Sequence, residues 1–270
     1  TDTLEEIVNY FYHQNHESAL EIIRQLEDQY KSLSDQLFSR ESLLKESKEV
    51  ITSHFDYIRG FTKDMFTVYE ERAVLAQGEL LTSILFYYYL QERGFDNACL
   101  LPALNFMRID KDEEPDYFYI RENLERELNN SPKYSIFITQ GYICRNVYGE
   151  IDNLKRGVSD YSASLIGAAI KGDEIQIWTD IDGVRNNDPR VVDQTYALEK
   201  LSFEEAAELS YFGAKILHPS SILPARDANI PVRLKNTYKP DAQGSLITKD
   251  EKHEGIKAIV DLAADLGIPG

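Results

Sequence analysis

The chain has 270 residues, of which 43% are hydrophobic and 28% are charged, a balance typical of a soluble globular protein with a sizeable core. Its formal net charge of −17 argues against nucleic acid or an anionic membrane as a partner, although a local group of Arg and Lys side chains could still hold a phosphate. Cys99 and Cys144 are too few for a disulfide framework or a zinc cage and indicate a reducing, cytoplasmic setting, while no apolar run approaches the roughly 20 residues of a membrane span.

Amphipathic helices are predicted for the first part of the chain. The spacing Thr3-x-x-Glu6 predicts a capping box, and the apolar positions that follow it at helical spacing are Leu4, Ile7, Val8 and Phe11. Further helices are predicted over residues 41 to 59, over 68 to 93, and over 16 to 32 with a buried side made of Ala19, Leu20, Ile23 and Leu26. Because no metal-ligand spacing such as HExxH is present, the residues interpreted as surface or capping positions are His13, His16 and His54.

The helix over residues 68 to 93 contains an unusual pair, Gly78-Glu79, before a strongly apolar run. A glycine inside a helix costs about 1 kcal/mol relative to alanine, which indicates that something approaches the helix closely there. Glu79 could be a solvated charge or a carboxylate of a binding site. The tyrosines at 87 to 89 are too dense for one helix face, so this helix is expected to be deeply packed.

From Asn97 onward the pattern changes to alternating strands and helices. Strands are predicted at 98–101, 106–109, 134–139, 174–178 and 231–235, and helices at 116–128, 160–171 and 202–212, with a short one from 218. This alternation predicts a mainly parallel sheet covered on both faces, where ligands bind beyond the carboxyl ends of the strands. The polar stretches just past strand ends are Thr139-Gln140-Gly141, Thr179-Asp180 and Asn236-Thr237. We therefore expect them to contribute to one site.

The stretch from Lys155 to Ala163 has the composition of an amino-acid site at a helix start. Arg156 could clamp a carboxylate with two parallel hydrogen bonds, and Asp160 could hold an ammonium group. The unpaired N–H groups of a helix start would add positive potential for an anion. The alternative is that Ser159 is an ordinary helix cap and Arg156 a solvated surface residue. This window by itself leaves both interpretations open.

Several stretches together carry a resemblance to a known family. In chain order they are Gly78-Glu79-Leu80, Ile138-Thr139-Gln140-Gly141-Tyr142, Arg156-Gly157-Val158-Ser159-Asp160-Tyr161, Trp178-Thr179-Asp180-Ile181-Asp182-Gly183, Asn187-Asp188-Pro189-Arg190, Glu204-Glu205-Ala206-Ala207-Glu208-Leu209, Phe212-Gly213-Ala214-Lys215-Ile216-Leu217-His218-Pro219, and Lys235-Asn236-Thr237 with Pro240, Gly244 and Ser245. With these motifs the chain resembles the aspartate kinases of the amino-acid kinase family over about residues 1 to 250.

The resemblance implies an α/β fold, a three-layer α/β/α sandwich with a mainly parallel central sheet. It implies a catalytic domain over residues 1–250, in which 1–133 are mostly an amino-acid-binding helical lobe and 134–250 mostly the nucleotide-binding part. Residues 251–270 would be a linker or the start of a truncated regulatory region. The implied reaction is ATP-dependent phosphorylation of the β-carboxylate of L-aspartate, the first step toward lysine, threonine and methionine.

The resemblance also implies residue roles. Arg156 would bind the α-carboxylate of the substrate, and Asp160 would organise the catalytic charges. The residues implied near the amino group are Glu79, Ser159 and Asp160, and Thr1 would touch aspartate. The residues implied for the nucleotide are Thr179, Asp180, Arg185, Arg190, Lys215 and Ile216. Bridging magnesium would take few protein ligands and the acceptor carboxylate is already ionised, so neither a metal motif nor a general base is expected.

The remaining expectations concern partners and departures from the family pattern. The resemblance implies a homo-oligomer, with ACT regulatory domains or a fused homoserine dehydrogenase outside this chain. The chain begins at Thr1, after the position of the family's Lys-Phe-Gly-Gly strand, so we expect a fragment with poor or absent activity on its own. Val158 stands where the family has a glycine. Two alternatives stay open: a kinase for another acidic amino acid, and a catalytically silent ligand-binding or regulatory subunit.

Overall fold

The computed structural model describes residues 2–63, 65–154, 158–186, 195–212 and 218–249. The chain divides into two compact units, Thr1–Asn153 and Leu154–Gly270, and each unit is described by itself. The functional division expected at residue 134 stays a prediction, because the two units reflect packing and not ligand binding.

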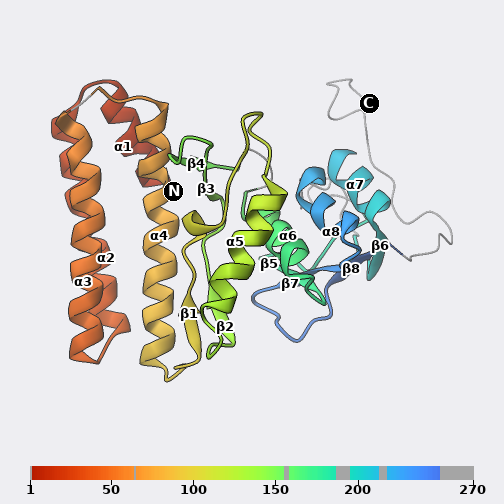
Figure 1. The fold of residues 1–270 in the computed structure, drawn as a ribbon. Helices are drawn as coiled ribbons and strands as arrows, with labels where there is room; N and C mark the ends of the chain where they lie inside the picture. Colours follow the sequence, from red (N-terminus) through yellow and green to blue (C-terminus); the bar gives the residue numbers. More distant parts are fainter. Residues whose placement is uncertain (1, 64, 155–157, 187–194, 213–217, 250–270) are drawn as a thin grey trace. The chain divides into compact units, whose positions relative to one another are not determined.

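In the first unit, long helices come first in the chain and short strands follow (Figure 1). The helices are α1 (Asp2–Tyr12), α2 (His16–Leu37), α3 (Glu41–Gly60) and α4 (Val68–Glu92), with a short 3-10 turn η1 (Phe61–Lys63) before the last. Their apolar faces share one core, whose largest fully buried members are Ile7, Phe11, Ile23, Ile51, Phe55, Ile58 and Leu81. The four helices predicted from apolar spacing are therefore confirmed, because each has a face to bury against the others.

Two details of these helices differ from the predictions. Leu20 is 40% exposed, because Ala19 and Ile23 make the inward face of α2 and Leu20 lies about 100° further round the helix. Thr3 is not an N-cap, since α1 already begins at Asp2. A capping box is instead present at Thr67, whose N–H donates to Glu70 Oε2 over 2.8 Å.

The strands of the first unit are short. They are β1 (Ala98–Leu100), β2 (Ile136–Ile138), β3 (Ile143–Arg145) and β4 (Ile151–Asn153), with the 3-10 turn η2 (Ala103–Asn105) and helix α5 (Tyr117–Asn129) between β1 and β2. β1 and β2 pair in parallel, and β3 and β4 form an antiparallel hairpin that was not predicted. The predicted strand over 106–109 is wrong: Arg108 and Ile109 make only isolated bridges, to Arg145 and Pro115. The strand predicted over 134–139 is β2, which is half-buried.

The second unit is a sheet with helices, and all of its described elements are ordered along the chain as follows. They are α6 (Val158–Ile170), β5 (Ile175–Thr179), β6 (Lys200–Ser202), α7 (Phe203–Phe212), η3 (Pro219–Ile222), α8 (Leu223–Asp227), β7 (Val232–Asn236) and β8 (Ser245–Thr248). The strand order in space is β5-β7-β8-β6. β5 pairs with β7 in parallel, β6 with β8 in parallel, and β7 with β8 antiparallel. The α/β class is therefore confirmed.

The core of the second unit lies under α6, α7 and α8, as the buried residues of these helices and of the strands form one cluster. A Cβ on Gly167 would come within 2.5 Å of Ile175 Cγ1, so this glycine lets α6 pack directly on β5. The capping box predicted at Ser202 and Glu205 is confirmed by reciprocal hydrogen bonds of 2.6 and 3.0 Å. Trp178, interpreted as a buried strand residue, is 45% exposed because it alternates with the buried Ile177 along β5.

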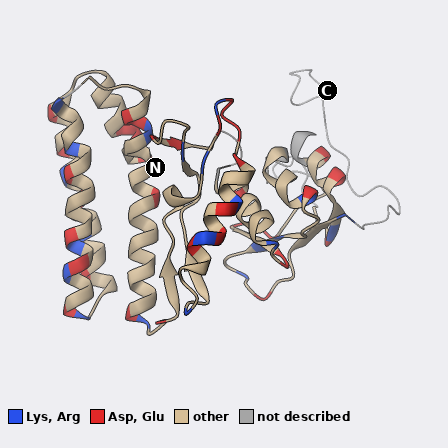
Figure 2. Cartoon of the chain, in the orientation of Figure 1, with Lys and Arg blue, Asp and Glu red and all other residues tan. Residues whose placement is uncertain are grey.

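Charged residues of both signs are interspersed along α2 and α3, as Figure 2 shows. Between these helices the Arg59 guanidinium pairs with Glu27, and Lys31 Nζ lies 2.6 Å from the same carboxylate. His54 of α3 was interpreted as a surface residue, but it is half-buried and its Nδ1 lies 2.6 Å from Gln77 Oε1 on α4. Across the described residues, we find no helix with the length and apolar character needed to cross a membrane.

Candidate functional site

Glu79 lies in the middle of α4, the helix that the first unit is built around. Its side chain is half-buried, and burial raises the pKa of its carboxyl group above the ordinary value for glutamate. The neighbouring Gly78 faces α1, where a Cβ would lie 3.1 Å from Leu4 Cδ1. The close approach expected at this glycine is therefore present, and it is made by a side chain. A carboxylate held half out of water is suited to a cationic ligand, which would restore its charged form.

The end of β2 carries a buried polar side chain. Gln140 is 2% exposed and lies against α4 and η2, where its amide is hydrogen-bonded at both ends. Two residues further on, Tyr142 has φ 67°, a left-handed conformation that is uncommon for a bulky side chain. An uncommon backbone conformation directly after a strand end is often associated with a functional segment.

Ser159 and Asp160 lie in the first turn of α6. The helix begins at Val158, so Ser159 is exposed within the turn and does not precede it as a cap. Asp160 is half-buried, and burial raises the pKa of its carboxyl group. Acidic side chains are favoured in the first turn, where the free N–H groups carry partial positive charge. Asp160 thus resembles Glu79 in its environment: both carboxylates are partly removed from water.

The carboxyl ends of β5 and β7 bring two predicted stretches together. Thr179 of β5 is paired with Asn236 of β7, and the Thr237 N–H donates to the Thr179 carbonyl over 2.8 Å. Thr179 Oγ1 donates to Asp180 Oδ1 over 3.1 Å. The expectation that Thr179-Asp180 and Asn236-Thr237 share one sheet edge is confirmed. Thr139-Gln140-Gly141 belongs to the other unit.

Next to this edge, Asp182 is held by two donors. Asn236 Nδ2 donates to Asp182 Oδ1 over 2.6 Å and Lys239 Nζ to Oδ2 over 3.0 Å, and the hydrogen bond from Lys239 holds the pKa of Asp182 below its usual value. Lys235 Nζ lies 4.8 Å from the centre of the exposed Trp178 ring. The edge thus presents an aromatic face and two ammonium groups, a combination that suits a nucleotide.

Arg185, predicted for the nucleotide site, has partners within its own loop. Its Nε donates to Thr195 Oγ1 over 2.7 Å and its Nη2 to the Thr195 carbonyl over 2.9 Å. These bonds leave one terminal nitrogen, Nη1, as the group with which Arg185 would reach a ligand. The predicted site residues that lie outside the described residues are Thr1, Arg156, Arg190, Lys215 and Ile216.

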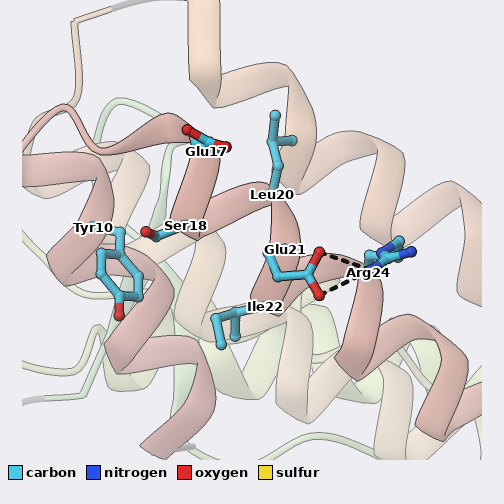
Figure 3. A pocket seen from close by; sticks show the side chains of 7 residues that line it. All are labelled: Tyr10, Glu17, Ser18, Leu20, Glu21, Ile22 and Arg24. Atoms are coloured by element: carbon cyan, nitrogen blue, oxygen red, sulfur yellow. Dashed lines mark hydrogen bonds and ion pairs between the residues drawn. The ribbon is translucent and has the colours of Figure 1, made fainter.

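Two further features of the described residues bear on ligand binding. A search of them for groups of three or more His, Cys, Asp or Glu side chains that could hold a metal ion finds none. A surface pocket lies on α1 and α2 (Figure 3), with described lining residues Tyr10, Glu17, Ser18, Leu20, Glu21, Ile22 and Arg24. Glu21 and Arg24 pair with each other across 2.8 Å, and the pocket's described lining includes no residue predicted for the site.

Sequence reasoning missed the polar contacts that hold α4 against the strands. Besides Gln140, the buried Asp152 of β4 accepts a hydrogen bond of 2.6 Å from Arg72 Nη1 of α4. Gln140 lay within a stretch already noted at a strand end, so its position was predicted although its partners were not. For Asp152 no local signal exists, because the hairpin that carries it was not predicted.

Comparisons with known proteins agree with the resemblance. Residues 16–236 match the sequence pattern of the Amino acid kinase family. The chain is 36% identical to the lysine-sensitive aspartokinase 3 of Escherichia coli over 177 residues, which is 64% of this chain and 39% of that protein. It is 38% identical to the chloroplastic aspartokinase 1 of Arabidopsis thaliana over 180 residues, 64% of this chain and 31% of that protein.

A solved structure is similar over most of the chain. It is Escherichia coli aspartokinase III in complex with aspartate and ADP, with a TM-score of 0.78 and 27% identity over 92% of this chain and 56% of that one. This similarity confirms the predicted fold. The chain spans less than two fifths of the length of the two curated relatives above.

Proposed function

The chain belongs to the amino acid kinase family, and from this premise we propose that it is the catalytic part of an aspartate kinase. The reaction is transfer of the γ-phosphoryl group of ATP to the β-carboxylate of L-aspartate, which gives 4-phospho-L-aspartate and ADP. The observation that supports it most is the 36–38% identity to aspartokinases from a bacterium and a plant. The similarity to an aspartokinase solved with aspartate and ADP supports the same substrates.

The amino-acid substrate has two charged ends besides the reacting carboxylate. Arg156 is assigned to the α-carboxylate, where a guanidinium can make two parallel hydrogen bonds. Glu79 and Asp160 are assigned to the ammonium group and its surroundings, with Ser159 and Thr1 beside them. Burial raises the pKa of both Glu79 and Asp160. A bound ammonium group would favour their ionised forms, so substrate binding and the charge of these carboxylates support each other.

The nucleotide is assigned to the second unit. The residues proposed for it are Thr179, Asp180, Arg185, Arg190, Lys215 and Ile216. The donor set described at the edge of β5 and β7 fits a nucleotide, because hydroxyl and ammonium groups lie beside an exposed aromatic ring. Magnesium supplies charge neutralisation at the phosphates when bound, and it keeps several water ligands. One carboxylate such as Asp180 suffices for it, which fits the lack of a three-ligand cluster among the described residues.

The chemistry requires positioning more than proton transfer. A β-carboxylate oxygen of aspartate forms a bond to the γ-phosphorus while the bond from that phosphorus to the bridging oxygen of ADP breaks. The nucleophile is already an anion at neutral pH, so no general base is needed. The residues must bring two anions together and neutralise their charge, which is the role assigned to Arg156 and to the cationic groups around the phosphates.

A hydroxamate assay tests the proposal. The full-length protein is incubated with ATP, magnesium and L-aspartate, ADP release is followed, and the acyl phosphate is trapped with hydroxylamine. We expect aspartate-dependent hydroxamate and ADP in equal amounts. L-Glutamate and N-acetylglutamate serve as competitors, and turnover of either in preference to aspartate would favour a kinase for another acidic amino acid. Binding of ATP without turnover of any acid would favour a silent subunit.

The wider setting stays a proposal as well. We propose a cytoplasmic homo-oligomer, with regulatory ACT domains or a homoserine dehydrogenase joined to this region in the complete protein. Several curated relatives carry both activities in their names, for example the bifunctional aspartokinase/homoserine dehydrogenase of Haemophilus influenzae, 34% identical over 227 residues, 81% of this chain and 28% of that protein.

A further inference from the structure

We propose that Gln140 is a positioning residue for Glu79, and that it acts through Ser83 on the same face of α4. This inference rests on the proposed function, since it extends the account of the amino-acid site. All residues involved lie within the first unit.

The Gln140 amide is buried and fully engaged. The Ala103 N–H donates to Gln140 Oε1 over 2.7 Å, and Gln140 Nε2 lies 2.5 Å from Ser83 Oγ. A backbone N–H can only donate, so the carbonyl oxygen of the amide must face Ala103 and the NH2 group must face Ser83. Ser83 Oγ in turn donates to the Leu80 carbonyl over 3.0 Å. The orientation of Gln140 is therefore determined, and it joins the end of β2 to α4.

The spacing along α4 places Glu79 between two such connections. Ser83 follows Glu79 by four residues, so the two side chains lie on one face about one turn apart. Arg72 precedes Glu79 by seven residues, about two turns, and reaches that face too. Arg72 is bonded to Asp152, which is 3% exposed on β4. Glu79 is thus flanked on one helix face by a connection to the β3–β4 hairpin and a connection to the end of β2.

Loss of the Gln140 bond would free this segment of α4. A buried amide donor or acceptor left without a partner is unfavourable, so the helix face and the strand end would shift or admit water. Glu79 is the carboxylate on that face that the proposed function assigns to the substrate ammonium group. A small displacement of a positioning group is enough to weaken binding or turnover. The nucleotide residues belong to the other unit, so the effect should be selective for the amino acid.

The test compares matched variants of the full-length protein. Gln140→Met removes both amide hydrogen bonds at similar volume, and Ser83→Ala removes the partner on α4. Ser47→Ala is the control, because Ser47 is equally buried and its Oγ donates to the Leu44 carbonyl three residues back, over 2.8 Å, without a contact to Gln140. We expect KM for aspartate to rise roughly ten- to a hundredfold in both test variants, with KM for ATP unchanged. Ser47→Ala should leave both constants unchanged.

A second measurement does not depend on activity. The pKa of the Glu79 carboxyl group is followed by 13C NMR in the wild type, in Gln140→Met and in Ser47→Ala. If Gln140 positions Glu79, the pKa falls toward the ordinary value of glutamate only in Gln140→Met, as water reaches the loosened face. An unchanged pKa together with an unchanged KM for aspartate would overturn the inference. A wild type that neither turns over nor binds aspartate would overturn the proposed function, while the change in pKa would still decide the role of Gln140.

Discussion

Arg72 Nη1 and Asp152 Oδ2 lie 2.6 Å apart, and this pair joins α4 to the β3–β4 hairpin across 80 positions of the sequence. Asp152 is 3% exposed and the Arg72 side chain 18% exposed, so both charges are largely withdrawn from water. The chain continues from this hairpin into the stretch that holds Ser159 and Asp160. The pair therefore anchors the segment that leads to one predicted site from the helix that carries the other.

Removal of one partner of this pair should be strongly destabilising. We expect Asp152→Ala to lower the free energy of unfolding by about 3 kcal/mol, because it leaves a guanidinium without its counter-charge in a poorly hydrated place. Urea denaturation followed by circular dichroism measures this. The double variant Arg72→Met with Asp152→Leu should recover most of the loss, and an equal loss in the double variant would show that the pair itself is not the cause.

Gly78 should show a coupling to Leu4. Replacement of a helix-interior glycine by alanine gains about 1 kcal/mol in helix propensity. In this chain the new Cβ would lie 3.1 Å from Leu4 Cδ1, which is tighter than ordinary contact. We expect Gly78→Ala to stabilise the protein in a Leu4→Ala background, by about 1 kcal/mol, and clearly less in the wild type. Additive effects of the two substitutions in urea denaturation would contradict this.

His54 should make stability depend on pH. Burial lowers the pKa of His54 below the value it has in the unfolded chain. When the pH falls through the unfolded pKa, the unfolded state binds a proton that the folded state does not, so stability decreases from about pH 7 toward pH 5. His54→Gln should remove this part of the slope. His13→Gln, at the exposed end of α1, is the control and should keep the wild-type slope of unfolding free energy against pH.

Ser245 should be important for the stability of the second unit. Its Oγ donates to the Leu198 carbonyl over 2.5 Å and accepts from the Val184 N–H over 2.9 Å, and the side chain is fully buried. Ser245→Ala leaves two buried backbone groups without this partner, which we expect to cost about 2 kcal/mol. Ser221→Ala is the matched control, because Ser221 is as buried and donates to the His218 carbonyl alone. Equal losses in thermal unfolding would argue against the double role of Ser245.

Asp160 should matter for turnover and not for folding. Asp160→Asn keeps the size of the side chain but removes the charge assigned to the substrate ammonium group. We expect kcat/KM for aspartate to fall by roughly a hundredfold, with an unchanged melting temperature. Asp173→Asn, an exposed position just beyond the other end of α6, is the control and should retain wild-type kinetics. Wild-type kinetics in Asp160→Asn would remove this residue from the proposed site.

The amino-acid sequence by itself determined the helices, the α/β class and the family. The helices α1 to α4 were predicted from apolar residues at helical spacing, since a helix that buries one face writes that face into a local repeat. The edge formed by Thr179 and Asn236 was predicted for a related reason: strands that alternate with helices pair in parallel, so their carboxyl ends meet.

Only the tertiary structure decided which polar side chains hold these elements together. Gln140 and Ser83 are 57 positions apart, and Arg72 and Asp152 are 80 apart. Strands of three residues such as β3 and β4 are too short to show an alternating pattern, so the hairpin that carries Asp152 leaves no local trace. Trp178 is exposed for the same kind of reason, because the sheet face it occupies depends on partners far along the chain. Local periodicity records which face of an element is buried, whereas a contact between two distant polar groups is specified only when the chain has folded.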